Sequence, residues 1–468
     1  MIEKTYIASG GTEFDFSDEE LDELFSEAFS KALADLNNSG NTVILPPDIT
    51  RFHSKAGFFT GIAGRELSNG RISSKNRLGA VLPALGTHMP MTNTELDKMF
   101  PGIPKDKFLI HDWRNDVSEL GRLDADWVEK TCCGAVRYDW PVQVNKILRK
   151  NSPDSGNFSM ILSIGQVVPH EVAGMANHGK NIFVGTGGKE AIDKSHFAGA
   201  AYGMEKMMGR IDTPVRSLFD EGLRRFGNEL PPILWVLTVV GARTDREAEA
   251  SGKARGSLAV RGLYVGFGRE CFEKAAKLAQ EVNVDIMDEP IHKAVVYLDP
   301  EEFRTTWLGN KAVYRTRMAI ADGGELLVLA PGLERFGEDL GVDELIRKYG
   351  YRPSSEIIAK VSGNAELGGN LSAAAHLIHG SSEGRFTIRY CTYSETSGES
   401  PAEKKPGVTK KEIESVGFEW GDLKEAQNRY DINKLNYGWN TLPCGEKFFF
   451  VPNPALGLWA EKRRFNSC

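Results

Sequence analysis

SMILSIGQVVPHEVAGMANHGKNIFVGTGGKEAIDKSH, residues 159–196, is the stretch that best defines the architecture of this 468-residue chain. Its first part, Ser159 to Ile164, is an apolar run that predicts a buried strand ending near Gly165. Titratable side chains follow the strand at His170, Lys180 and His196. A histidine can ligate a metal or move protons near neutral pH, and a lysine can be tied covalently to a cofactor. The stretch therefore predicts a strand that leads into a reaction centre.

The rest of the chain repeats this alternation of apolar strands and amphipathic helices. Further strands are predicted at Thr42–Leu45, Ile233–Val240, Ala294–Leu298 and, after the turn Asp322-Gly323-Gly324, Leu326–Leu329. Helices are predicted at Glu270–Glu281 and Lys311–Ala321. The pattern is typical of an α/β protein, and the length favours two domains. We expect each domain to hold a mostly parallel sheet flanked by helices, with the active-site cleft between them.

The domain boundary is predicted between Val282 and Pro290, where a helix gives way to a strand. This division gives an N-terminal cofactor- and substrate-binding domain, 1–285, and a C-terminal α/β domain, 286–454. The last residues, 455–468, are expected to pack back on the first domain. The stretch 394–408 (SETSGESPAEKKPGV) is predicted to be an exposed loop, because its composition disfavours burial.

Composition narrows the range of partners and compartments. The net charge of −7 argues against a nucleic-acid partner, which usually selects a basic surface. No apolar run approaches the roughly 20 residues that span a bilayer, and the N-terminus lacks the features of a signal peptide. The six cysteines include no C-x-x-C pair, so we expect reduced thiols in a cytoplasmic protein without structural zinc or a membrane partner.

Two loops after predicted strands carry further candidate residues. In PPDITR, residues 46–51, Asp48 and Arg51 are placed to face a ligand at the carboxyl end of the sheet, and arginine matches a carboxylate. The alternative is a surface turn with a capping aspartate. In GTHMPMT, residues 86–92, His88 lies just before a capping box that starts a helix at Thr92. A lone loop histidine can equally be a bystander.

Other motifs give weaker indications. The glycines of 185–188 could present backbone N–H groups to a phosphate, although a turn explains them as well. Gly266-Phe267-Gly268 lacks the acidic partner of a dinucleotide site. His376 and His379 share a helix face without an evident third ligand, which favours a structural pair.

The combined motifs resemble the lactate racemase family of nickel-pincer-nucleotide enzymes. The segments that carry the resemblance run in the family's order: PDITR (47–51), ALGTHMPMTNTEL (84–96), HDWRNDVSELG (111–121), PVQVN (141–145), GQVVPHEVAGMANHGKNIFVGTGGKEAIDKSH (165–196) and NKAVYRTRMAIADGG (310–324). They cover both expected domains. The spacings from His170 to Lys180 and from Lys180 to His196 also agree with the family.

The resemblance implies a role for each matching residue. Lys180 corresponds to the lysine that links covalently, as a thioamide, to pyridinium-3,5-bisthiocarboxylic acid mononucleotide nickel, and His196 to the protein ligand of the nickel. His88 and His170 correspond to the acid/base pair, and Arg51 to the carboxylate anchor. Two further residues, Asp48 and Lys311, fall where they would touch the cofactor or substrate. Separate enzymes make this cofactor, so the chain would depend on them.

The implied reaction inverts C2 of a 2-hydroxy acid. Hydride moves to the cofactor and back through a flat 2-keto acid, while the two histidines handle the hydroxyl proton on either face. The chain departs from the family before the lysine, where it reads Met175-Ala176-Asn177-His178-Gly179, and at Trp307-Leu308. It also resembles the longer subgroup labelled D-mannonate epimerase, so the substrate is expected to be D-gluconate/D-mannonate, with Asn177 and His178 suited to its polyhydroxylated tail.

Two alternatives remain open. One is a racemase of a smaller or aromatic 2-hydroxy acid, such as lactate or malate. The other is a non-catalytic protein that binds the cofactor, which would tolerate the loss of His88 and His170.

Overall fold

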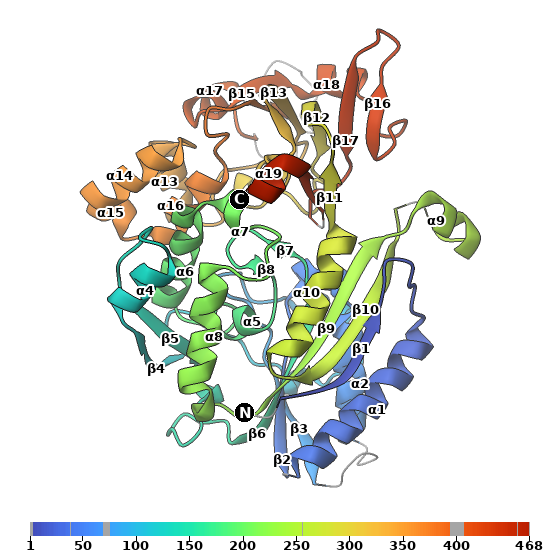
Figure 1. The fold of residues 1–468 in the computed structure, drawn as a ribbon, viewed down its shortest axis with the longest axis vertical. Coiled ribbons are helices and arrows are strands. Elements are labelled where there is room, and N and C mark those ends of the chain that lie inside the picture. Colours follow the sequence, from blue (N-terminus) through green and yellow to red (C-terminus); the bar gives the residue numbers. More distant parts are fainter. Residues whose placement is uncertain are drawn as a thin grey trace. The chain divides into compact units, whose positions relative to one another are not determined.

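The structure is a computed structural model, and it describes residues 3–37, 39–68, 75–254, 256–393, 407–455 and 457–467. The chain divides into two compact units. The first contains residues 1–198 and 207–283, and the second contains residues 199–206 and 284–468. Each unit is built on a mixed, mainly parallel sheet flanked by helices (Figure 1), which confirms the predicted α/β class. The expected loop at 394–408 falls mostly outside the described residues.

The first unit is organised around a six-stranded sheet of order β1-β10-β9-β6-β2-β3. The strands are β1 (Lys4–Gly10), β2 (Gly40–Leu45), β3 (Asn76–Val81), β6 (Phe158–Gln166), β9 (Ile233–Ala242) and β10 (Leu258–Phe267). β9, β6, β2 and β3 run parallel to one another, and β10 pairs antiparallel with both β9 and β1. The predicted strands at Thr42–Leu45, Ser159–Ile164 and Ile233–Val240 are confirmed as β2, β6 and β9.

Helices cover both faces of this sheet. They are α1 (Asp18–Leu36), α2 (Ala56–Ser68), α3 (Asn93–Met99), α4 (Ala125–Thr131), α5 (Gly179–Phe183), α6 (Lys189–Tyr202), α8 (Pro214–Phe226), α9 (Asp245–Ser251) and α10 (Arg269–Asn283). Short 3-10 turns lie at η1 (Ile49–Ser54), η2 (Lys105–Lys107), η3 (Lys146–Leu148) and η4 (Gly227–Glu229). Two small antiparallel pairs complete the unit: β4 (Val117–Leu123) with β5 (Trp140–Asn145), and β7 (Pro169–His170) with β8 (Gly174–Met175).

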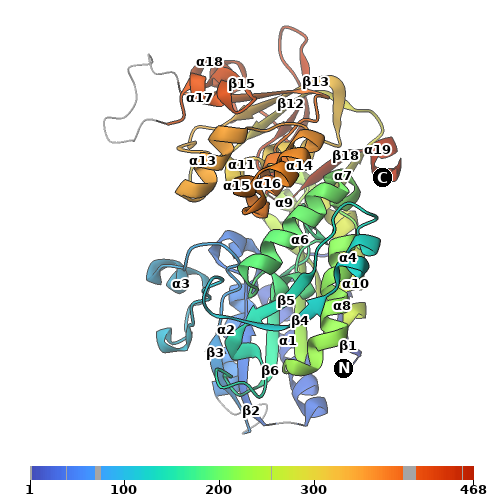
Figure 2. The same cartoon turned by 90° about the vertical axis from the view of Figure 1, so that its left-hand side faces the viewer.

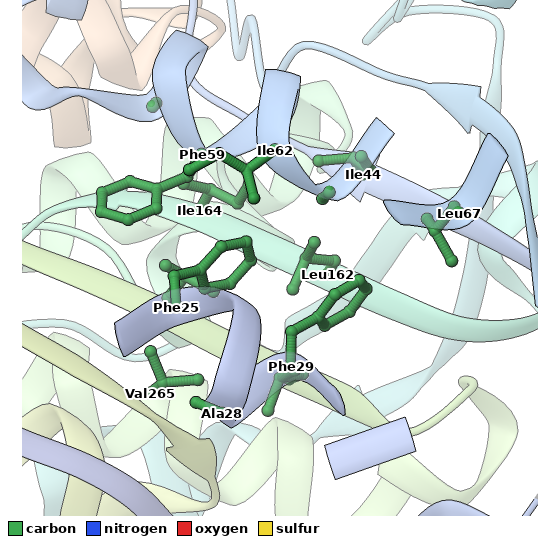
Figure 3. Packing of buried hydrophobic residues seen from close by; sticks show 14 of the residues in the cluster. Phe25, Ala28, Phe29, Ile44, Phe59, Ile62, Leu67, Leu162, Ile164 and Val265 are labelled. Carbon is green, nitrogen blue, oxygen red and sulfur yellow. The ribbon is translucent and has the colours of Figure 1, made fainter. Parts of the chain in front are cut away.

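The core of the first unit lies between α1, α2 and one face of the sheet. Phe25 and Phe29 of α1 stack with ring centroids 5.4 Å apart, and Phe59 of α2 meets Phe25 edge-on at 5.2 Å (Figure 3). Leu162 and Ile164 of β6 are fully buried against these rings. On α1, the capping box that Ser17 forms with Glu20 fixes the first turn. The apolar packing anchors β6, the strand that leads into the candidate site.

The second unit has a sheet of order β15-β14-β13-β12-β17-β16, parallel except for the β16–β17 pair. Its strands are β11 (Val284–Met287), β12 (Ile291–Tyr297), β13 (Ile320–Leu329), β14 (Thr387–Thr392), β15 (Glu419–Asp422), β16 (Gly438–Thr441), β17 (Lys447–Val451) and β18 (Leu458–Glu461). β11 pairs in parallel with β18, so residues 458–461 are held within this unit. Helices α13 to α16 form one group of its helices (Figure 2).

The helices of the second unit are mostly short. They are α7 (Met204–Met207), α11 (Thr306–Gly309), α12 (Lys311–Thr316), α13 (Leu340–Tyr349), α14 (Ser354–Gly363), α15 (Ala365–Gly368), α16 (Leu371–His379), α17 (Lys410–Ser415), α18 (Leu423–Arg429) and α19 (Lys462–Ser467). Among the described residues, no helix is long and apolar enough to cross a membrane.

The segment 311–329 differs from its prediction. The helix α12 ends at Thr316 instead of Ala321, because the chain joins strand β13 from Ile320 onward. The turn Asp322-Gly323-Gly324 lies inside that strand as an irregularity in its pairing with β12. Strand pairing there overrides the helical propensity of the sequence.

Candidate active site

Three neighbouring parallel strands deliver most of the predicted site residues to one edge of the first unit's sheet. β3, β2 and β6 lie in that order. His88 is in the loop after β3, Arg51 is in η1 after β2, and His170 ends the short β7 that follows β6. Loops at the carboxyl ends of adjacent parallel strands converge in space, and this edge is where ligands bind in open α/β sheets.

Asp48 links the first two of these loops. It caps η1 by accepting the Thr50 N–H at 3.1 Å, and its Oδ2 lies 2.5 Å from His88 Nδ1. Burial alone would raise the pKa of Asp48, but the neighbouring His88 charge and the hydrogen bonds from His88 and Thr50 outweigh it and lower the pKa to about 2. The side chain is 6% exposed, so Asp48 is a buried carboxylate rather than part of a surface turn.

His88 is oriented by this carboxylate. Its Nδ1–H donates to Asp48, which leaves the Nε2 lone pair of the neutral ring directed away from the pair. The side chain of His88 is 40% exposed, whereas Asp48 is buried behind it. A carboxylate that fixes the tautomer of an accessible imidazole is the arrangement of an oriented general base.

His170 is bound differently. It is buried, and its Nδ1 accepts the Val172 N–H at 3.1 Å, so the proton of the neutral ring sits on Nε2. Burial, in first place, holds the pKa of His170 well below its ordinary value. The charge of Glu171 opposes this shift, whereas the charges of Lys180, Arg51 and His196 act in the same direction as burial.

Lys180 is the second residue of α5 and is partly buried. Burial, together with the positive Arg51, lowers the pKa of Lys180 to about 8, while Glu171 and Asp48 oppose the shift. The next residue, Asn181, fixes the helix, because its Nδ2 donates to Leu45 O at 3.1 Å and to Ser163 Oγ at 2.9 Å. A lysine with this pKa is partly unprotonated near neutral pH and can act as a nucleophile.

Arg51 is placed to bind an anion. Its backbone N–H donates to Asp48 O at 3.0 Å, and its conformation departs from the helical values of its neighbours in η1. No acidic side chain among the described residues forms an ion pair with its guanidinium. An arginine without a carboxylate partner offers its planar fork to a carboxylate from outside the protein.

His196 lies on α6 with its tautomer fixed. Its Nδ1 donates to Ile192 O, 2.7 Å away and one helical turn earlier, so Nε2 keeps its lone pair. Burial lowers the pKa of His196, and Lys180 is among the groups whose charge acts on it. A neutral imidazole with a backbone-bound Nδ1–H is the form that ligates a metal through Nε2.

A protein-family model matches a large part of the first unit. Residues 18–208 match the model of the lactate racemase N-terminal domain. The match covers less than half of the chain, and within it lie Arg51, His88, His170, Lys180 and His196.

Two solved structures share the fold. One is a protein from Thermotoga maritima, with a TM-score of 0.74 and 21% identity over 97% of this chain and 100% of that chain. The other is the lactate racemase apoprotein of Thermoanaerobacterium thermosaccharolyticum, with a TM-score of 0.65 and 14% identity over 98% of this chain and 100% of that chain. A search of curated proteins found no match.

Lactate racemase-family enzymes use a nickel-pincer nucleotide, and the residues present here fit such a group. No cluster of three or more metal-ligating side chains exists among the described residues, so a nickel at His196 needs most of its ligands from outside the protein. A pincer that carries its own sulfur and carbon ligands meets this need. The buried amine of Lys180 and the lone pair of His196 are the matching protein groups.

Three further predicted contributors make other contacts in the structure. Lys311 begins α12 in the second unit, with its ammonium 5.4 Å from the Phe303 ring centroid, and its contact with cofactor or substrate stays a prediction. The ring of His178, which the sequence places at the substrate tail, packs in a tilted arrangement against Trp235 with centroids 4.3 Å apart. Asn177 also has a partner within the protein, because its Oδ1 accepts a hydrogen bond from the His178 N–H.

The glycine-rich stretch 185–188 closes α5 instead of forming an open phosphate cradle. The N–H groups of Gly185, Thr186 and Gly187 donate to the carbonyls of Lys180, Ile182 and Val184. In the second unit, His376 Nε2 hydrogen-bonds to Tyr351 OH at 3.0 Å inside the core, as a structural histidine does.

Sequence reasoning missed Arg216, which supports the segment before Lys180. This fully buried residue of α8 donates to Met175 O at 2.5 Å and to Asn177 O at 3.1 Å. Only its place on the apolar face of an amphipathic helix could have marked it, because a charged residue there needs a buried partner.

Proposed function

We propose that this chain binds the nickel-pincer nucleotide through Lys180 and His196 and inverts C2 of a 2-hydroxy acid with Arg51, His88 and His170. The observation that supports it most is the order of β3, β2 and β6, because the segments that follow these neighbouring strands carry His88, Arg51 and His170. A metal ligand, a linking amine, an anion anchor and an acid/base group in one place have no evident joint role in a storage protein.

The protein's own part in this proposal is binding and proton transfer. When bound, the cofactor would accept the hydride of C2 and return it to either face of a 2-keto acid. Arg51 would hold the substrate carboxylate as a pivot. For one configuration His88 would take the hydroxyl proton at Nε2, whose lone pair is available, while the neutral His170 would donate a hydrogen bond from its Nε2–H to the oxygen. The roles exchange for the opposite configuration.

For the substrate we propose a six-carbon aldonate, D-gluconate/D-mannonate. The support is the resemblance of the sequence to the longer subgroup of the family. Because His178 packs against Trp235 and the Oδ1 of Asn177 accepts the His178 N–H, other polar groups would have to bind the substrate hydroxyls. A racemase of lactate, malate or a similar acid is the competing proposal, in which no such groups are needed.

The deciding experiment measures intact mass and nickel content of protein produced together with the cofactor-making enzymes. The wild-type chain should carry the nucleotide as a covalent adduct, and Lys180→Ala should lose it. Lys146→Ala, which removes a surface lysine paired with Asp116, should keep the adduct. An adduct that survives Lys180→Ala would refute the proposed linkage.

A substrate panel then tests the reaction. Loaded enzyme should interconvert D-gluconate and D-mannonate, and turnover of lactate or malate alone would favour the competing substrate. A loaded protein that converts no 2-hydroxy acid, and that retains the adduct after His88→Asn and His170→Asn, would instead support the non-catalytic reading.

A further inference from the structure

The first unit contains a second cavity, of about 350 Å³, that is separate from the candidate active site. None of Asp48, Arg51, His88, His170, Lys180 and His196 lines it. Its walls are mostly apolar and include flat rings, among them Leu223, Leu230, Pro231, Ile233, Trp235 and Phe267. Cavities of this size with apolar walls and a few polar groups are typical small-molecule sites.

Among the residues that line this cavity, His178 indicates best what kind of ligand could bind there. The side chain is 3% exposed and lies between the rings of Trp235 and Phe272, at centroid distances of 4.3 and 5.2 Å. In the described part of the chain, neither ring nitrogen of His178 has a hydrogen-bond partner. Asp220 Oδ1, 3.8 Å from His178 Nδ1, also has none. Leaving buried polar atoms unpaired destabilises the protein, so an occupant that pairs them is favoured.

The backbone places His178 here at a cost. Asn177 and His178 have φ values of 68° and 55°, a region that residues other than glycine rarely adopt. The carbonyl of Asn177 is held by the buried Arg216, which fixes this conformation. Strained backbone of this kind is concentrated at functional positions. An occupant of the cavity would meet the chain two residues before Lys180.

The charges of the lining favour a neutral occupant with a hydrogen-bond donor. Arg269 is already paired with Asp220 and Asp212, and Arg224 is paired with Glu221, so neither arginine is available to an anion. The remaining charged residues of the lining, Lys150 and Glu3, have opposite signs. Asp220 Oδ1, the carboxylate oxygen that is not paired with Arg269, can only accept a hydrogen bond. A hydroxyl group satisfies this acceptor, and it can also pair with an imidazole nitrogen.

We propose that this cavity is a second ligand site, which binds a neutral aryl alcohol with its ring against Trp235 and its hydroxyl toward His178 and Asp220. The site is independent of the proposed reaction, because it shares no residue with the candidate active site.

The proposal is tested by measuring the binding of three small aromatic compounds to the full chain, by calorimetry and ligand-observed NMR. The compounds are p-cresol, toluene and p-toluate, which share a methyl-substituted ring and carry a hydroxyl, no polar group and a carboxylate, respectively. We expect saturable binding of p-cresol at least about tenfold tighter than binding of toluene, the equivalent of one hydrogen bond. p-Toluate should bind more weakly than p-cresol, because its carboxylate would face Asp220.

Two variants locate the binding. His178→Phe keeps an aromatic ring between Trp235 and Phe272 but removes both nitrogens, and it should weaken p-cresol about tenfold without affecting toluene. Asn228→Trp, at an exposed position of the lining, should block both ligands and leaves the core intact. The control is His292→Phe, the same substitution at an exposed position in the second unit.

The proposal is overturned if p-cresol does not bind, if toluene or p-toluate binds equally well, or if Asn228→Trp leaves p-cresol binding unchanged. If His178→Phe fails to fold, the probe series and Asn228→Trp still decide the outcome.

Discussion

Asp48 Oδ2 and His88 Nδ1 are 2.5 Å apart, although forty residues separate them in the sequence. The contact exists because β2 and β3 are neighbours in the sheet and each ends in one of the two loops. A buried carboxylate thereby sets the tautomer of a half-exposed imidazole.

Replacing this carboxylate should affect the chemical step more than binding. In Asp48→Asn, an amide takes the place of the group that accepts the Nδ1 proton and stabilises the imidazolium, so kcat should fall by about 10²–10⁴-fold. Asp124→Asn, a helix-capping aspartate of α4, is the matched control and should retain full activity. A change confined to KM would show that Asp48 does not act through His88.

Binding of the substrate carboxylate at Arg51 should depend on the planar shape of the guanidinium as well as on its charge. Arg51→Lys keeps the charge but loses the planar fork, and we expect KM to rise by about 10–100-fold, as for the loss of one charge-assisted hydrogen bond. The control is Arg114→Lys, at an exposed residue that stacks on Trp113. Unchanged KM in Arg51→Lys would place the substrate carboxylate elsewhere.

The amine of Lys180 should react at unusually low pH in protein without cofactor. Because burial lowers its pKa to about 8, acylation of Lys180 by acetic anhydride should increase most steeply around pH 8, as followed by peptide mass spectrometry. The exposed Lys434 serves as the reference in the same digest. A labelling profile for Lys180 identical to that of Lys434 would contradict the burial of the amine.

The lowered pKa of Lys180 also makes the free energy of unfolding depend on pH. Between pH 8 and the ordinary lysine value of 10.5, the unfolded chain keeps a proton at Lys180 that the folded chain has released. Stability should therefore rise with pH across this window. In Lys180→Met, urea unfolding should show a smaller rise, and an equal rise in both proteins would argue against the lowered pKa.

The fate of the C2 hydrogen distinguishes hydride return from proton exchange. If the histidines handle only the hydroxyl proton, epimerisation in deuterated water should give product without deuterium at C2, as read by NMR. Incorporation at C2 would show that His88 or His170 removes the carbon-bound proton instead.

The sequence predicts the strands that carry the candidate site better than it predicts the hydrogen bonds between the site residues. Runs such as Ser159–Ile164 are apolar enough to predict buried strands, and parallel strands bring their following loops to one edge. The pairing of Asp48 with His88 could not be derived, because it depends on which strands become neighbours. The candidate residues of the first unit therefore came from the motif, and the structure supplies their hydrogen bonds.

Two other predictions were wrong for reasons that a sequence pattern does not contain. The orientation of His178 follows from positive φ values at two non-glycine residues, which no sequence pattern predicts. The helix expected over Lys311–Ala321 is cut short because Ile320 pairs with Ile291 in the sheet, a long-range contact that local propensity does not contain.

The placement of β3, β2 and β6 side by side has an evolutionary consequence. Each strand ends in a separate loop, so the residues that meet the substrate can be exchanged one loop at a time while the apolar strands stay unchanged. New specificities within this lineage should therefore arise from insertions and substitutions between strands, and ancestral reconstruction can follow them loop by loop.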